Sequence, residues 1–250
     1  MITNISIVSV FVAMLHGTMP RRHAFPVGTV PAMSTIVIVG GHGKVALLLA
    51  GALVAQGHVV RSTIRDQAHG ADVEATGATP YLLDIEGSDA GDFADTFGDA
   101  DAIVFSAGAG GKGGPERTRA VDLDGALKAV QGAGQAGVRR FVMVSAHGVD
   151  EPLPDDTAAG WRAYVKSKRD ADAALRDSGL DWTVVRPGGL TDDPATDRVA
   201  MAPGLESGTI PRADVAAVLV AVLGDASSIG AQFELTSGAQ SVSDALASLP

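Results

Sequence analysis

The segment Val39-Gly40-Gly41-His42-Gly43-Lys44-Val45-Ala46 decides the fold, because it joins an apolar run to a helical stretch. The run before it, IVIV at residues 36–39, is apolar on both faces, as a buried strand of a parallel sheet is. Residues 44–56 then predict a helix that Gly57 ends. The segment is therefore the turn of a strand–turn–helix unit.

The glycine spacing of this turn is typical of dinucleotide binding. Gly40 allows a tight turn out of the strand, and Gly43 allows the backbone to approach a pyrophosphate closely. The small side chain of Ala46 lets the helix pack against the sheet. Free N–H groups at the start of the helix, at Lys44 and Val45, then meet the phosphates. An ordinary tight turn between a strand and a helix is the alternative.

The rest of the chain alternates apolar β-branched runs with helical stretches. Further strands are predicted near residues 58–64, 79–83, 102–105, 140–144, 182–186 and 233–236. Helices are predicted near residues 67–75, 116–135, 160–178 and 212–223, with a short helix at the C-terminus and a loop over residues 189–208. This order predicts an α/β fold, namely a doubly wound Rossmann-type parallel sheet in three α/β/α layers. A single domain over residues 33–250 is expected, with a small substrate-pocket region at about 188–211.

Composition restricts the possible functions. A hydrophobic content of 46% with 19% charged residues indicates a compact protein. The chain has no cysteine, and its histidines do not cluster with carboxylates, so no metal site is predicted. A formal net charge of −10 argues against nucleic acid as a partner. No serine lies in a nucleophile-elbow sequence, which argues against a hydrolase.

Residues 1–32 differ in character from the rest of the chain. They contain the apolar run ISIVSVFVAML at residues 5–15, which is too short to span a bilayer and has no positive charge before it. We therefore expect a leader that is disordered or absent from the mature protein, with Met33 as the start of a soluble, cytoplasmic protein without a membrane partner. An export signal or a membrane anchor is the alternative.

The end of the second predicted strand indicates the type of dinucleotide. NAD sites usually carry an acidic residue there, which holds the ribose 2′-hydroxyl. This strand reads VVRSTIR and has no carboxylate before Asp66, whereas Arg65 is placed to bind a 2′-phosphate with its forked guanidinium. NADP(H) is therefore favoured over NAD(H). A solvated arginine at a strand end is the alternative.

Other candidate ligands follow the third and fourth predicted strands, where ligands of open α/β sheets bind. Asp84 and Ile85 follow the third strand and are assigned to the adenine. Ala107 and Gly108 follow the fourth strand and are assigned to the ribose and phosphates. Helix capping and turn formation are the alternative roles of these residues.

Tyr164 and Lys168 are four residues apart on a predicted helix, so they share one face. An ammonium next to a phenol favours the phenolate, and is expected to lower the phenol pKa from its usual value near 10. The phenol can then act as general acid or base on a carbonyl or an alcohol, while Lys168 holds the nicotinamide ribose. A tyrosine beside a solvated lysine is the alternative.

Several segments resemble the short-chain dehydrogenase/reductase superfamily, most closely its atypical, extended-like NAD(P)H-binding branch. They are VGGHGKVA at 39–46, VDLDGALKAVQGAGQAGVRRFVMVSA at 121–146, YVKSK at 164–168, SGLDWTVVRPGGLTD at 178–192 and GTIPRADVAAVLVAVL at 208–223. The resemblance covers essentially all of residues 33–250. It implies a Rossmann fold, a catalytic Tyr164–Lys168 pair, and an arginine-proline-glycine turn, Arg186-Pro187-Gly188, that lines the nicotinamide end.

The chain departs from the family pattern at two positions, Ala146 and Asp122. Redox members usually have a serine or threonine just beyond the fifth strand to hold the substrate carbonyl, and Ser145 is assigned this role. Ala146 stands where extended members tend to place the catalytic serine, and His147 is an alternative donor. Asp122 replaces an asparagine that is common on the preceding helix.

The prediction is an NADP(H)-dependent oxidoreductase that transfers hydride between nicotinamide and a small carbonyl-type, quinone or flavin-like substrate. A redox-sensing regulator that binds NADP(H) without turnover, and an epimerase or dehydratase acting on a nucleotide sugar, are the alternatives. Since dimers and tetramers are usual in the resembling family, a homo-oligomer is expected. The predicted cofactor-binding residues are Gly40, Gly41, Gly43, Lys44, Val45, Arg65, Asp84, Ile85, Ala107, Gly108, Lys168, Pro187 and Gly188, and the predicted catalytic residues are Tyr164, Lys168 and Ser145.

Overall fold

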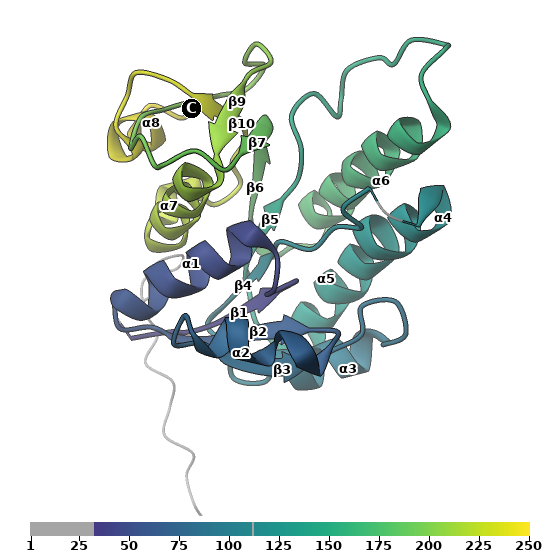
Figure 1. Ribbon diagram of the computed structural model, residues 1–250, viewed down its shortest axis with the longest axis vertical. Helices are drawn as coiled ribbons and strands as arrows, with labels where there is room; N and C mark the ends of the chain where they lie inside the picture. Colours follow the sequence, from purple (N-terminus) through teal and green to yellow (C-terminus); the bar gives the residue numbers. More distant parts are fainter. Residues whose placement is uncertain (1–32, 112) are drawn as a thin grey trace, which may run out of the picture.

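The computed structural model describes residues 33–111 and 113–250, so the expected leader at residues 1–32 lies outside the described residues (Figure 1). The strands are β1 (Thr35–Val39), β2 (Val59–Ile64), β3 (Thr79–Leu82), β4 (Ala102–Phe105), β5 (Arg140–Val144), β6 (Asp181–Pro187), β7 (Gly189–Thr191), β8 (Val199–Ala202), β9 (Thr209–Pro211) and β10 (Gln232–Ser237). The α-helices are α1 (Lys44–Ala55), α2 (Gly70–Glu74), α3 (Ala90–Phe97), α4 (Gly114–Thr118), α5 (Gly125–Ala136), α6 (Ala159–Arg176), α7 (Arg212–Gly224) and α8 (Val242–Ala247). The described residues also form two 3-10 turns, η2 (Gln67–His69) and η4 (Ala226–Ser228), and a π-helical turn, η3 (Arg119–Asp124).

The main sheet has the strand order β3-β2-β1-β4-β5-β6-β10-β8. All neighbouring pairs from β3 to β10 are parallel, and the first six strands have the order of a Rossmann fold, which confirms the predicted fold class. β8 pairs antiparallel with β10, so the sheet is mixed at this edge and not wholly parallel as expected. β7 and β9 pair in a separate two-stranded sheet.

Helices cover both faces of the sheet and bury two apolar cores. α1, α7 and α8 lie on one face, where Leu49 and Leu219 are fully buried (Figure 1). α3, α5 and α6 lie on the other face, where Phe93 and Phe97 are fully buried. The chain therefore forms the expected α/β/α layers, because strands such as β1 and β4 are apolar on both faces and need cover on each.

The predicted helix over residues 116–135 is interrupted in the structure. α4 and α5 are separated by the π-helical turn η3, which places Asp122 in the buried interior. Such turns insert one residue into a helix and recur at functional sites. The hydrophobic period does not reveal a single inserted residue, which is why sequence analysis predicts one continuous helix.

Two further segments differ from the prediction. α3 is an additional helix, begun by a reciprocal capping pair in which Asp89 and Asp92 each accept from the other's backbone N–H. The loop predicted over residues 189–208 contains β7 and β8. β8 is a short edge strand in which Val199 and Met201 are buried in alternation with alanines, so its apolar signal is weak.

The parallel strands point their carboxyl ends to one edge of the sheet. After β1 the chain crosses to the face covered by α1, and after β4 it crosses to the face covered by α3 and α5. This divergence creates the crevice in which doubly wound sheets bind ligands. Within residues 33–111 and 113–250, none of the helices combines the length and apolarity that crossing a bilayer requires.

Candidate active site

The glycine turn after β1 is closely packed between β2 and the turn that follows β4. Gly40 has a φ of +83°, and a Cβ there would lie 2.7 Å from the Cα of Ala107. A Cβ on Gly41 would lie 2.4 Å from the Cβ of Ser62. The N–H groups of Gly40 and Gly41 donate to Thr63, at 3.2 and 2.8 Å. These two glycines therefore build the turn, and their own amides are already used within the protein.

The first turn of α1 offers N–H groups to a ligand. Gly43 is the N-cap residue, in extended conformation, and within residues 33–111 and 113–250 α1 has no side-chain cap hydrogen bond. The first three helical residues, Lys44, Val45 and Ala46, precede the first intrahelical bond, in which the amide of Leu47 donates to the carbonyl oxygen of Gly43 at 2.9 Å. Unsatisfied amides at the positive end of a helix dipole fit a pyrophosphate.

A cavity of about 830 Å³ extends from the start of α1 to α6. The predicted site residues that line it are Gly43, Lys44, Val45, Ala107, Gly108, Ser145, Tyr164, Lys168, Pro187 and Gly188. Gly40, Gly41, Arg65, Asp84 and Ile85 lie outside its lining. The structure thus brings the predicted pyrophosphate-binding helix start and the predicted catalytic residues to one cavity, of the size that small-molecule sites have.

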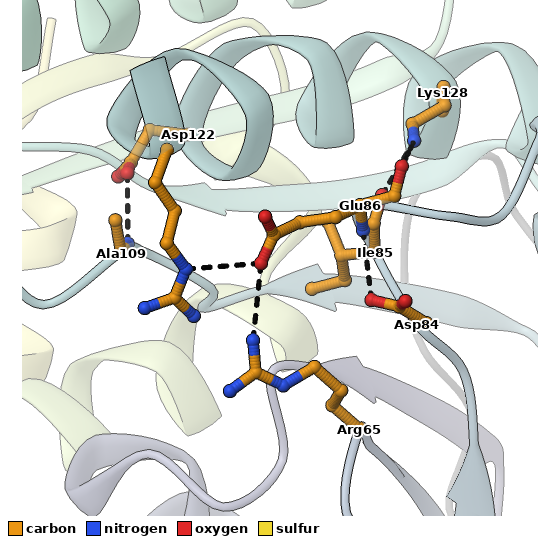
Figure 2. Close-up of polar contacts among 8 residues, drawn as sticks. Arg65, Asp84, Ile85, Glu86, Ala109, Asp122 and Lys128 are labelled. Carbon is orange, nitrogen blue, oxygen red and sulfur yellow. Dashed lines mark hydrogen bonds and ion pairs between the residues drawn. The ribbon is translucent and has the colours of Figure 1, made fainter. Parts of the chain in front are cut away.

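The remaining predicted ligands lie at the carboxyl ends of β2 and β3 (Figure 2). The carboxylate of Asp84 accepts from the amide of Glu86 at 3.2 Å and so shapes the turn after β3. The carbonyl oxygen of Ile85 accepts from Lys128 at 2.6 Å. Arg65 donates to the Glu86 carboxylate at 3.1 Å. The guanidinium predicted to bind a 2′-phosphate is therefore paired with a carboxylate of the protein itself.

Lys168 is held at the end of the cavity nearest α6. Its Nζ lies 6.0 Å from the centre of the Tyr164 ring and 3.1 Å from Oδ1 of Asp122, and both members of this ion pair are buried. The ammonium also lies 3.3 Å from the carbonyl oxygens of Ala107 and Val144, to which it donates. Asp122, which stands where an asparagine is common in the family, thus supplies the counter-charge of Lys168.

The pKa of the Tyr164 phenol is raised above its usual value, so the expected net lowering is wrong, although Lys168 itself acts in the expected direction. Burial contributes most of this rise in pKa, and Lys168 opposes it. The carboxylates of Asp122 and Asp172 raise the pKa further, because they offset the positive charge of the lysine. The phenol therefore keeps its proton at neutral pH, as a general acid does.

Ser145 is held by a buried carboxylate beneath the cavity. Its hydroxyl donates to Oδ2 of Asp172 at 2.9 Å, and the Nε of Arg186 donates to the same oxygen at 2.9 Å. Burial raises the pKa of Asp172, while Arg186 and Ser145 oppose the rise. Next along the chain, Ala146 and His147 also line the cavity. The predicted orienting residue therefore lines the cavity, with its hydroxyl donating to Asp172.

Sequence analysis did not assign several residues at the cavity. The Trp161 ring lies 5.2 Å from the Tyr164 ring and is 54% exposed. Asp192, in the segment after β7, forms ion pairs with both Lys44 and Arg212, which come from α1 and α7. The three-residue spacing of Trp161 and Tyr164 on one helix face is the signal that would have identified the aromatic pair.

Comparisons with known proteins agree with this geometry. Residues 40–226 match the protein family described as NAD(P)H-binding. A Bacillus subtilis protein named uncharacterized sugar epimerase YhfK is 36% identical over 219 residues, which span 86% of this chain and 99% of that protein.

Two solved structures resemble the fold over most of its length. A Bacillus halodurans protein assigned as an NAD-dependent epimerase/dehydratase has a TM-score of 0.79 and 33% identity, covering 86% of this chain and 99% of its own. The oxidoreductase ylbE from Lactococcus lactis has a TM-score of 0.76 and 27% identity, and the match covers 86% of this chain and 95% of its own.

Proposed function

Because the chain belongs to the NAD(P)H-binding family, we propose that it is an NADP(H)-dependent reductase of small carbonyl-type or quinone-like substrates. The predicted resemblance to the atypical short-chain dehydrogenase/reductase branch is confirmed. Some relatives are named as epimerases and another as an oxidoreductase, so the choice between these two kinds of reaction rests on the site. The observation that carries the proposal is that Tyr164 lines the same cavity as the ligand-binding start of α1, with a phenol whose pKa is raised by burial.

The residues present fit a dinucleotide. The first-turn amides of α1 and the ammonium of Lys44 would hold the pyrophosphate, and the turn at Ala107 and Gly108 would hold the adjoining ribose and phosphates. Lys168 would hold the nicotinamide ribose, as the family resemblance implies. The reduced nicotinamide, when bound, supplies hydride to the carbonyl carbon.

Tyr164 supplies the proton in this proposal. Its phenol is neutral before the reaction, because burial and two carboxylates raise its pKa. As the substrate oxygen gains negative charge, the phenol donates its proton to that oxygen. The ammonium of Lys168 then stabilises the phenolate that remains. The neutral phenol is the form of Tyr164 that can donate a proton during reduction of a carbonyl.

The exposed apolar side chains of the cavity favour a planar substrate. Trp161 and Leu190 are large hydrophobic side chains that line the cavity and stay partly exposed. An indole beside the proton donor offers an aromatic face on which a flat ring can stack. Quinones and flavin-like rings match this surface better than small aliphatic ketones.

An acceptor screen tests the proposal. Purified protein and NADPH are mixed with aliphatic carbonyls, quinones and flavins, and loss of reduced-nicotinamide absorbance is recorded. Turnover with at least one planar acceptor supports the reductase. NADPH binding without turnover of any acceptor contradicts the reductase and favours a regulator that binds NADP(H) without turnover. The observation that supports such a regulator is the ion pair in which Asp122 neutralises Lys168.

A further inference from the structure

Arg65, Glu86 and Arg117 form a charged cluster outside the cavity, at the carboxyl ends of β2 and β3. Oε1 of Glu86 accepts from Nη1 of Arg65 at 3.1 Å and from Nε of Arg117 at 3.1 Å. Figure 2 shows the Arg65 guanidinium and the Glu86 carboxylate pointing toward one another, below the helical segment that carries Asp122. The three residues come from the ends of β2 and β3 and from α4, so folding assembles the cluster.

The backbone that carries Glu86 is held by hydrogen bonds, whereas its side chain is held only by partly exposed ion pairs. Nζ of Lys128 donates to the carbonyl oxygens of Ile85, Glu86 and Ser88, at 2.6, 3.2 and 2.8 Å. The Glu86 side chain is 34% exposed, and those of Arg65 and Arg117 are 57% and 28% exposed. Partly exposed ion pairs are individually weak, so a competing anion can replace the carboxylate without disturbing the fold.

One carboxylate oxygen between two guanidinium groups marks a position that suits an anion. Two arginines and one glutamate leave a net positive charge. A phosphate monoester carries about −1.5 to −2 charges at neutral pH and presents three acceptor oxygens, so it can bind both guanidinium groups at once. The ribose 2′-hydroxyl of NAD(H) has no charge and gains nothing from the second arginine.

We propose that Arg117 is a second specificity-determining residue for the 2′-phosphate of NADP(H), and that Glu86 occupies this anion site until the phosphate displaces it. The inference rests on the proposed function for the type of cofactor and is independent of the reaction. Arg65 and Arg117 then bind the phosphate together. Glu86 weakens NADP(H) binding, because its carboxylate competes for the same guanidinium groups.

Calorimetric titration of the full chain with 2′,5′-ADP and 5′-ADP tests this assignment without any turnover. Arg117→Ala is expected to weaken 2′,5′-ADP binding at least about tenfold, the usual loss for a charge-assisted hydrogen bond, while 5′-ADP binding changes less than about twofold. Glu86→Gln is expected to tighten 2′,5′-ADP binding several-fold and to leave 5′-ADP binding unchanged. NADPH and NADH are expected to repeat this pattern.

Two matched variants control for folding and long-range charge. Arg119→Ala removes a positive charge from η3 that pairs with Asp124 and not with Glu86. Glu116→Gln removes a negative charge next to Arg117 at an exposed position. Neither control is expected to change the ratio of the affinity for 2′,5′-ADP to the affinity for 5′-ADP.

Three outcomes overturn or separate the assignments. If the ratio of 2′,5′-ADP affinity to 5′-ADP affinity stays constant in both Arg117→Ala and Glu86→Gln, the inference is overturned. It is also overturned if Glu86→Gln selectively loses binding of 5′-ADP and NADH, because Glu86 would then hold the ribose hydroxyl. A ratio that changes as expected in a protein without turnover supports the inference while the reductase proposal fails.

Discussion

Lys168 and Asp122 form a buried ion pair, with Nζ 3.1 Å from Oδ1 and side chains that are 6% and 0% exposed. Further hydrogen bonds offset the loss of solvation, since Oδ2 of Asp122 accepts from the amide of Ala109 at 2.9 Å. The pair joins the π-helical turn to α6 and holds Lys168 in place. Both of its charges also act on the pKa of Tyr164.

Breaking this pair is expected to destabilise the protein. Asp122→Ala leaves a buried ammonium without its counter-charge, and the expected loss in the free energy of unfolding is about 3–5 kcal/mol. Urea denaturation measures this loss. The double variant Asp122→Ala/Lys168→Met is the matched control and is expected to recover a large part of the stability. A single variant within about 1 kcal/mol of wild type would show that the pair is unimportant for folding.

The pH dependence of reduction should report the raised pKa of Tyr164. A proton donor is active below its pKa, so the rate at saturating NADPH is expected to stay constant through neutral pH and to fall only above about pH 10. Asp122→Asn removes a carboxylate that raises this pKa, and the fall is expected to move to lower pH. A rate that already falls within the neutral pH range would contradict Tyr164 as the proton donor.

Trp161 is expected to bind planar substrates and to leave proton transfer unaffected. Trp161→Ala should raise the KM for a quinone about tenfold, because an aromatic stacking surface is lost, while kcat changes little. A small aliphatic carbonyl serves as the matched control substrate, and its KM is expected to be unchanged. Steady-state kinetics measure both values. An equal rise in KM for the two substrates would mean that the ring only supports the shape of the cavity.

Ser145, and not the neighbouring position 146, is expected to orient the substrate. Ser145→Ala removes a hydroxyl that Asp172 holds at the cavity, and kcat should fall by about 100-fold or more. Ala146→Ser adds a hydroxyl where extended relatives tend to place theirs, and is expected to leave kcat within about twofold. Initial rates at saturating NADPH compare the two variants, and the opposite ranking would move the role to position 146.

The fold could be predicted because the sequence signals for its turns and strands depend mainly on residues that are close along the chain. The turn at Gly40 needs glycine for its backbone angle and its contact with Ala107, and the apolar runs of β1 and β4 need cover on both faces. The order of these elements then specifies the Rossmann sheet. β8 was missed because an edge strand of alternating valine, methionine and alanine has only a weak apolar pattern.

Charge relationships across the fold were harder to predict. Lys168 and Tyr164 are close in sequence, so their pairing could be read from helical spacing. Burial is the main cause of the raised Tyr164 pKa, and it depends on tertiary packing. Asp122 adds to the rise in pKa; it lies 46 positions before Lys168 and reaches it through the π-helical turn. The pairing of Arg65 with Glu86 likewise depends on two neighbouring strands ending at one edge of the sheet.

The most direct test of the account is a single-turnover measurement with Tyr164→Phe. The substitution removes only the hydroxyl, so NADPH affinity is expected to stay within about twofold of wild type. The rate of NADPH oxidation by a quinone that the wild type reduces is expected to fall at least about 100-fold, the usual contribution of a positioned general acid. Equal rates for Tyr164→Phe and wild type would contradict the assignment of Tyr164 as the proton donor.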